Sequence, residues 1–213
     1  MTGKTHLICT VTAYTVIAVL HKEGITVPSI GGSTTVMPLL GIPAAALGSL
    51  MPDIDIENST MSNRIPFFKG MLKHRGITHT LLFVILAWLG IQNHYNVMTT
   101  GIIGALMGLL IGITFAKGKV LFTSVGMAIA FTSAALAMPG LVAALMFGLS
   151  VGWAGHIFED LLNKKGCPIL FPISKSHIHF LSIKTRSWQE TIFFLLWEFV
   201  WIGYLGGKLS GKL

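Results

Sequence analysis

No charged side chain interrupts residues 99–115, which run Thr-Thr-Gly-Ile-Ile-Gly-Ala-Leu-Met-Gly-Leu-Leu-Ile-Gly-Ile-Thr-Phe. A helix that crosses a bilayer needs about 20 apolar residues, with a lower limit of about 17. Glycine recurs along this stretch at positions 101, 104, 108 and 112. Small residues at such a spacing let two helix backbones approach closely in lipid. The stretch therefore predicts a membrane helix that packs tightly against another helix.

Similar apolar stretches occur along the whole chain and predict the fold class. They lie at about residues 5–20, 36–51, 78–92, 99–115, 120–138, 140–162 and 189–206. Several are at or just below the spanning limit, so they either extend through neighbouring Ser, Thr and Gly residues or cross half the bilayer. Only 11% of the 213 residues are charged, against about 25% in soluble domains. We therefore expect an all-α protein, a polytopic membrane helix bundle with about six to seven transmembrane helices. It should form a single domain over residues 1–213, with motif-bearing loops at about 52–77 and 160–188.

The basic residues indicate the orientation of this bundle. The formal net charge is +7, but the Lys and Arg residues lie in short clusters between apolar stretches, without a nucleic-acid-binding motif around them. Membrane lipids are therefore the expected partners, and nucleic acid is not. With seven crossings, twelve of the 15 basic residues share the side of the N-terminus, and the other three are Lys22, Lys208 and Lys212. The positive-inside rule then predicts a multi-pass inner-membrane protein with a cytoplasmic N-terminus. The C-terminal residues Lys208 and Lys212 fit this orientation poorly, so the last segment is either spanning or re-entrant.

Histidines and aspartates gather at the ends of four apolar stretches, on the predicted cytoplasmic face. They are His6, Asp53, Asp55, His74, His79, His156 and Asp160. Carboxylates near helix C-termini oppose the helix dipole, and at the edge of hydrocarbon they are costly unless a cation neutralises them. His156 and Asp160 are four residues apart and so project from one helix face. The pattern predicts a metal site at one membrane face.

The ligand types narrow the choice of metal. Histidine and carboxylate together suit zinc, manganese or iron better than calcium, which prefers oxygen alone. Seven candidate ligands exceed the three or four of a mononuclear zinc site, so a divalent metal, zinc or manganese, is expected, with room for two ions. Arg75 is a candidate phosphate clamp or a topology determinant. Glu159 either serves as a catalytic base or faces away from His156. His21, His94, His177 and His179 are expected to be ordinary loop residues.

At these residues the chain resembles the YdjM-like family of membrane-bound, metal-dependent hydrolases, sometimes described as LexA-regulated. The matching segments are Thr5-His6, Leu50–Asp55, His74–Thr80, Gly155-His156 with Asp160, and Gly166–Pro172. The last of these is similar to the family's Gly-x-Pro-aliphatic-Leu-x-Pro segment. The chain departs from the family pattern at Arg186, where the pattern predicts glycine.

The resemblance implies a hydrolase, and a distant similarity to zinc phospholipases C fits a helical, His- and Asp-rich site. We expect metal-activated water to cleave a lipid-borne phosphoester, so the substrate should be lipid-like and phosphorylated. The alternative is a non-enzymatic metal-binding membrane protein, either a transporter or a sensor. A transporter should carry ionisable groups at mid-membrane on several helices, and here Glu198 is the exception among residues that stop at one face. A structural protein whose polar residues merely cap helices leaves their clustering unexplained.

Overall fold

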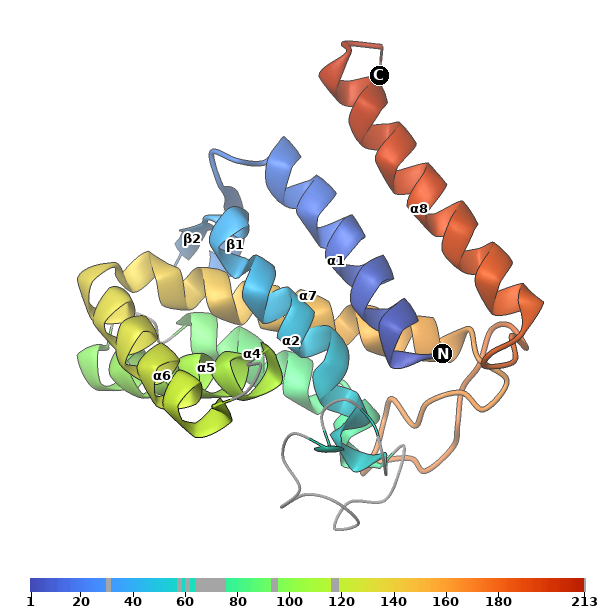
Figure 1. The fold of residues 1–213 in the computed structure, drawn as a ribbon, viewed down its shortest axis with the longest axis horizontal. Helices are drawn as coiled ribbons and strands as arrows, with labels where there is room; N and C mark the ends of the chain where they lie inside the picture. The colour runs from blue at the N-terminus through green and yellow to red at the C-terminus, as the bar shows by residue number, and fades with distance from the viewer. Residues whose placement is uncertain are drawn as a thin grey trace.

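Helices dominate the computed structural model of the protein, which describes residues 1–29, 32–56, 59, 62–63, 76–92, 96–115 and 119–212. The α-helices within these residues are α1 (Gly3–Leu20), α2 (Ile42–Leu50), α4 (Leu82–Gln92), α5 (Val97–Phe115), α6 (Val120–Ala137), α7 (Pro139–Leu161) and α8 (Trp188–Leu209) (Figure 1). Five of them, namely α1, α5, α6, α7 and α8, are long and apolar enough to cross a membrane. The predicted all-α membrane bundle is confirmed, and each apolar stretch of the sequence contains one α-helix.

The apolar stretch at 36–51 is divided by prolines. Two short 3₁₀ helices, η1 (Pro38–Gly41) and η2 (Met51–Asp55), flank the nine-residue α2. Each of these three elements carries a proline at its first or second position. Proline has no backbone N–H with which to continue a preceding helix, so each proline starts a new element. As a result, Asp53 and Asp55 lie in a tight 3₁₀ turn at the end of α2.

The stretch at 78–92 is divided in a similar way. A 3₁₀ helix, η4 (Ile77–His79), ends at Thr80, whose backbone is extended. Helix α4 then begins at Leu82 and has eleven residues, fewer than a full crossing needs. His79 therefore lies just ahead of an apolar helix, at the same end of the bundle as η2, which contacts η4.

A β-hairpin that the sequence analysis did not predict joins α1 to η1. Strands β1 (Ile25–Ser29) and β2 (Gly32–Val36) are antiparallel, with Ile25 opposite Val36. The strands are rich in Thr and Val, whose branched side chains favour extended backbone. Val27 and Val36 are buried in the main core, and β2 contacts α7. The hairpin thus closes the end of the bundle opposite to η2 and η4.

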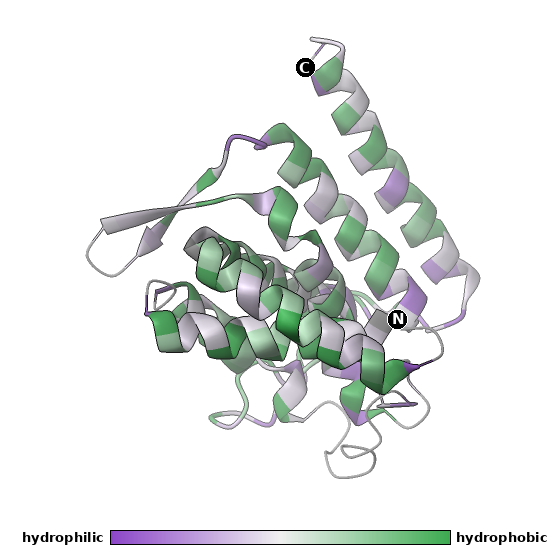
Figure 2. Ribbon diagram, turned by 60° about the vertical axis from the view of Figure 1, so that its left-hand side comes forward, coloured by the Kyte–Doolittle hydropathy of each residue, from purple (hydrophilic) through white to green (hydrophobic). Residues whose placement is uncertain are grey.

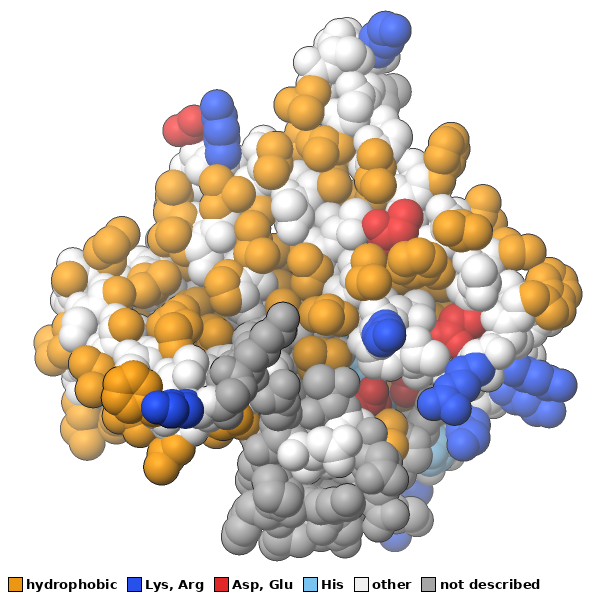
Figure 3. Space-filling model, viewed as in Figure 1, with side chains coloured by type: hydrophobic (Ala, Val, Ile, Leu, Met, Phe, Trp, Pro, Cys, Tyr) orange, Lys and Arg blue, Asp and Glu red, His pale blue; other side chains and the backbone are white. Residues whose placement is uncertain are grey.

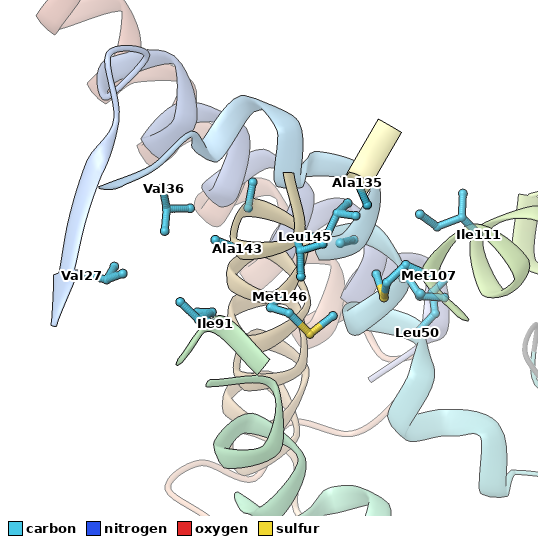
Figure 4. Close-up of a cluster of buried hydrophobic side chains, with 14 of the residues drawn as sticks. Val27, Val36, Leu50, Ile91, Met107, Ile111, Ala135, Ala143, Leu145 and Met146 are labelled. Atoms are coloured by element: carbon cyan, nitrogen blue, oxygen red, sulfur yellow. The ribbon is translucent and has the colours of Figure 1, made fainter. Parts of the chain in front are cut away.

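Helix α7 is the central element of the bundle. It contacts α1, α2, α4, α5 and α6, and Leu145 and Met146 on α7 belong to the main hydrophobic core. Figure 4 shows side chains from α2, α4 and α5 around it, including Leu50, Ile91 and Met107. Because the core surrounds α7, the last turns of this helix have a fixed position relative to its neighbours.

The glycines of the 99–115 stretch lie against α6. A Cβ added to Gly108 would overlap the backbone of Met127, and one added to Gly112 would lie 2.6 Å from Ser124 Cα. Gly104 likewise meets α6, with Phe131 O at 3.0 Å from its Cβ position. The close helix packing predicted from this stretch is therefore confirmed, and α6 is the partner.

An equally close contact joins α2 to α7. A Cβ on Gly148 would overlap the carbonyl group of Gly41, and a Cβ on Gly152 would overlap that of Ala45. On the other side of the contact, a Cβ on Gly48 would meet Trp153 N at 2.9 Å. The two backbones touch without intervening side chains, so the end of α2 is held against the middle of α7.

Helix α8 runs parallel to α1 along the outside of the bundle. Thr5 Oγ1 donates to Glu190 Oε1 at 2.8 Å near the start of both helices, and Thr12 Oγ1 donates to Glu198 Oε2 at 2.8 Å two turns further on. The 22 residues of α8 form one continuous apolar helix. This length favours a full crossing over the re-entrant alternative. In Figure 2, apolar residues line most of α8, and its far end stands apart from the bundle.

We predict that Gly152→Ala will destabilise the protein, because the added methyl group forces α2 away from α7. Overpacking of this kind costs about 1–3 kcal/mol, so the melting temperature in detergent should fall. Gly203→Ala in α8 is the matched control, since a Cβ there meets nothing within 4 Å. Equal melting temperatures for the two variants would contradict the close contact.

Candidate metal centre

Seven ionisable side chains from four distant segments meet at one end of the bundle. They are His6 in the first turns of α1, Asp53 and Asp55 in η2, His79 in η4, and His156, Glu159 and Asp160 near the end of α7. None of them is more than 8% exposed. A cluster with this many buried carboxylates is costly unless cations or hydrogen bonds compensate the charge.

His156 has a defined tautomer because of the contact between α2 and α7. Its Nδ1 lies 2.7 Å from the carbonyl oxygen of Ser49. A carbonyl oxygen can only accept, so Nδ1 carries the proton and Nε2 of the neutral ring holds a free lone pair. That Nε2 is buried without a hydrogen-bond partner and lies 3.5 Å from Asp53 Oδ1. His156 is thus held in the form that ligates a metal through Nε2.

His6 is arranged in a similar way by Glu159. The distance from His6 Nδ1 to Glu159 Oε2 is 2.9 Å, and Nε2 lies 3.5 Å from Asp160 Oδ1. Glu159 is itself positioned by Thr10, whose hydroxyl donates to Oε1 at 3.0 Å. The His6 ring also stacks on that of His156, with ring centroids 3.9 Å apart. Glu159 therefore lies behind His6, and Asp160 lies in front of it.

His79 has the same two-sided environment. Its Nδ1 lies 3.1 Å from Thr78 Oγ1 and 3.4 Å from Asp55 Oδ2, and the Thr78 hydroxyl donates to Asp55 Oδ2 at 2.6 Å. On the other side, Nε2 lies 3.7 Å from Asp160 Oδ2 and 3.9 Å from Asp53 Oδ1. The turn is anchored to α7 because Trp153 Nε1 donates to the Thr78 carbonyl at 2.8 Å.

The three imidazoles are therefore arranged in the same way. Each has a partner at Nδ1, and each directs Nε2 toward the carboxylates of Asp53 or Asp160. Two overlapping groups have ligand atoms within 4.8 Å of one another, namely His6, Asp53 and His156, and His79, His156 and Asp160. Metal-binding histidines typically have their second nitrogen fixed by a carboxylate or carbonyl group. The donor set and its supporting groups thus fit a divalent metal.

The carboxylates also show why a cation would be favourable here. Burial raises the pKa of Asp53 above its ordinary value, and the neighbouring Asp160 raises it further, while His6 and His79 act in the opposite direction. A bound cation would stabilise the ionised form of Asp53 by direct attraction. In the described structure, the α-amino group of Met1 lies 2.9 Å from Asp160 Oδ1, at the edge of the site.

Of the remaining residues singled out in the sequence, His74, Arg75 and His94 lie outside the described residues. His177 and His179 are exposed in the loop before α8, and His21 is at the far end of α1. One buried carboxylate, Glu190, was not predicted from the sequence, because there it resembles an ordinary first-turn residue of an apolar helix.

The fold and the site together define an integral membrane protein with a buried histidine–carboxylate centre at one end of its helices. The chain belongs to the YdjM inner membrane protein family, whose family model matches residues 1–209. The resemblance of its motifs to this family is thereby confirmed. Neither a curated protein nor a solved structure matches the chain.

We predict that Asp53→Asn and His156→Ala will each lower the amount of metal bound to the purified protein at least about tenfold, because each removes a ligand atom from the shared donor set. Metal analysis after purification in detergent measures this directly. His177→Ala is the control and should bind as the wild type does, since His177 is exposed in the loop. Stoichiometric metal in His156→Ala would contradict a centre built on this residue.

Asp55→Asn should have a milder effect. Its carboxylate faces Nδ1 of His79, and loss of such a supporting group typically weakens metal binding by about 10–100-fold without abolishing it. A titration with zinc and with manganese gives the affinity. If Asp55→Asn loses as much metal as Asp53→Asn does, then Asp55 is a direct ligand.

Proposed function

We propose that the protein is a metal-dependent hydrolase that cleaves a phosphoester of a membrane lipid at the cytoplasmic surface of the inner membrane. The observation that carries the proposal is the convergence of three Nε2 atoms on the carboxylates of Asp53 and Asp160 at one end of the spanning helices. When bound, a divalent metal supplies Lewis acidity and an activated water, which is the chemistry that phosphoester hydrolysis needs.

The side chains divide naturally into two roles. The proposed ligands are the five side chains whose ligand atoms lie close together in the two groups, namely His6, His79, His156, Asp53 and Asp160. Glu159 and Asp55 are proposed to orient His6 and His79 from behind. The position of Glu159 next to His6 Nδ1 supports this role better than that of a catalytic base, because a base must reach the substrate.

The same geometry bears on the number of metal ions. The two donor groups share His156, whose Nδ1 is engaged with Ser49, so this imidazole can serve one ion. A second ion would need Asp53 or Asp160 as a bridging carboxylate, each of which has two oxygens. We propose zinc or manganese as the metal, because both accept imidazole and carboxylate ligands.

The proposed cytoplasmic position rests on charge. The site is formed where α1 begins and α7 ends, and most of the basic residues of the chain lie in segments predicted on that side. Figure 3 shows Lys and Arg side chains gathered near the start of α8, below an apolar surface. This distribution supports a cytoplasmic site under the positive-inside rule.

A transporter is the second candidate, because Glu198 lies inside α8 and pairs with Thr12 of α1. The other carboxylate oxygen of Glu198, Oε1, is buried without a hydrogen-bond partner in the described structure. Transport sites, however, typically combine ionisable groups from several helices at mid-membrane. Among the described residues, those that form the centre lie at the helix ends. Metal flux into proteoliposomes without lipid cleavage would favour the transporter.

We predict that His79→Gln will reduce hydrolysis of a phospholipid or polyprenyl phosphate by about 100-fold or more, since losing a ligand should cost more than the 10–100-fold typical of a supporting group. The variant should still fold, because glutamine keeps a polar side chain and the bundle is held by apolar packing and small-residue contacts. A detergent melting curve checks this. His179→Gln, in an exposed loop, is the control; full activity in His79→Gln would exclude His79 as a ligand.

A further inference from the structure

A cavity of about 410 Å³ opens between the first turns of α1 and α8, next to the metal centre. Thr5 on its wall precedes His6, so the cavity and the centre are separated by the backbone of a single helical turn. The lining side chains that matter for its chemistry are Lys4, Thr5, Ile8, Arg186, Trp188 and Phe194. It is therefore an amphipathic cavity, with cations on one wall and apolar or aromatic groups on another.

The shape of the cavity depends on one buried carboxylate. Glu190 is only 4% exposed, and it accepts hydrogen bonds from Thr2 N at 2.7 Å, Thr5 Oγ1 at 2.8 Å and Arg186 N at 2.5 Å. Because these donors come from α1 and from the loop before α8, Glu190 joins the two walls. The three hydrogen bonds favour the ionised form of Glu190 and occupy its oxygens, so the carboxylate is held in the wall and keeps its single negative charge.

The two cationic side chains are available to a ligand. Among the described residues, neither the Lys4 ammonium nor the Arg186 guanidinium pairs with a carboxylate. Arg186 has φ of 60°, a left-handed conformation that favours glycine, and Glu190 holds its N–H in this turn. Within the described part of the chain, the cavity wall thus carries two positive charges without an ion-pair partner, against the one hydrogen-bonded carboxylate of Glu190, and this excess of positive charge favours an anion.

The apolar wall indicates where that anion comes from. Trp188 is 72% exposed at the start of a spanning helix, the position where tryptophan typically meets the lipid headgroups. Ile8 and Phe194 line the cavity one to two turns further along α1 and α8, toward the middle of these two candidate spans. A ligand that fills the cavity therefore contacts cations at headgroup depth and hydrocarbon below. A lipid has this chemistry, and free phosphate lacks the apolar part.

We propose that this cavity binds the phosphate headgroup of an anionic membrane lipid, with Lys4 and Arg186 contacting the phosphate and Ile8, Trp188 and Phe194 contacting the start of the lipid chains. The binding site stands on the cavity alone. Its role in presenting the lipid to the metal centre rests on the proposed function. Arg guanidinium and Lys ammonium are the usual phosphate partners, and Arg adds a bidentate geometry.

The test measures lipid binding to the purified full chain by native mass spectrometry, with phosphatidylglycerol as the anionic probe and phosphatidylcholine as the zwitterionic one. Lys4→Gln and Arg186→Gly should each weaken binding of phosphatidylglycerol by about tenfold, as expected for one charged hydrogen bond. They should weaken the binding of phosphatidylcholine less, because its choline cation offsets the charge of its phosphate. Glycine suits a φ of 60°, so Arg186→Gly removes the guanidinium without straining the fold. Lys184→Gln is the matched control, since Lys184 lies in the same loop but does not line the cavity.

Three outcomes would overturn the proposal. The first is wild-type affinity for phosphatidylglycerol in both cavity variants, and the second is an equal loss in Lys184→Gln, which would indicate a diffuse surface charge. The third is displacement of the lipid by inorganic phosphate at comparable concentration, which would identify free phosphate as the ligand. Metal content, measured on the same samples, should be unchanged in the cavity variants. If the wild type binds lipid as expected but contains no metal, the hydrolase proposal fails while the lipid site stands.

Discussion

The contact between the backbones of α2 and α7 is the constraint on which the site depends. Gly148 and Gly152 have no side chain to separate the two helices, so the carbonyl group at the end of α2 reaches the imidazole of α7. The same contact positions η2, so that Asp53 Oδ1 lies 3.5 Å from His156 Nε2. In lipid, such close approach depends on van der Waals packing, because there is no hydrophobic force between apolar helices. The small residues of this contact are therefore what brings the candidate ligands of the site together.

The buried polar groups around the three imidazoles all have the same role, which is to hold a ring in place. Every imidazole of the centre has a partner at Nδ1, although the partner differs each time: a carbonyl oxygen for His156, a glutamate for His6, and Asp55 with Thr78 for His79. Such partners fix ring orientation and leave Nε2 facing the centre. Their variety indicates that the orientation of the rings, more than any particular supporting residue, is what this fold maintains.

Much of this arrangement could be predicted from the sequence, and the rest depends on tertiary structure. Apolar stretches and glycine spacing predicted the helices, and polar residues at helix ends predicted that distant segments meet. The division of 36–51 was visible only as two prolines within the apolar run and a third, Pro52, just beyond it, and the hairpin was hidden in a short Thr- and Val-rich segment. The position of Asp55 behind His79, and that of Glu190 between two helices, could not be predicted, because both follow from packing between segments that the sequence does not connect.

The wide separation of the ligands along the chain has a consequence for biosynthesis. His6 enters the membrane with the first helix, but Asp160 belongs to the penultimate spanning helix, and the wall completed by Glu190 belongs to the last. Because the ribosome delivers residues at about 5–20 per second, several seconds or more separate the synthesis of His6 from that of Asp160. The candidate metal centre is therefore completed only when α7 has been inserted, and the wall that contains Glu190 only when α8 follows.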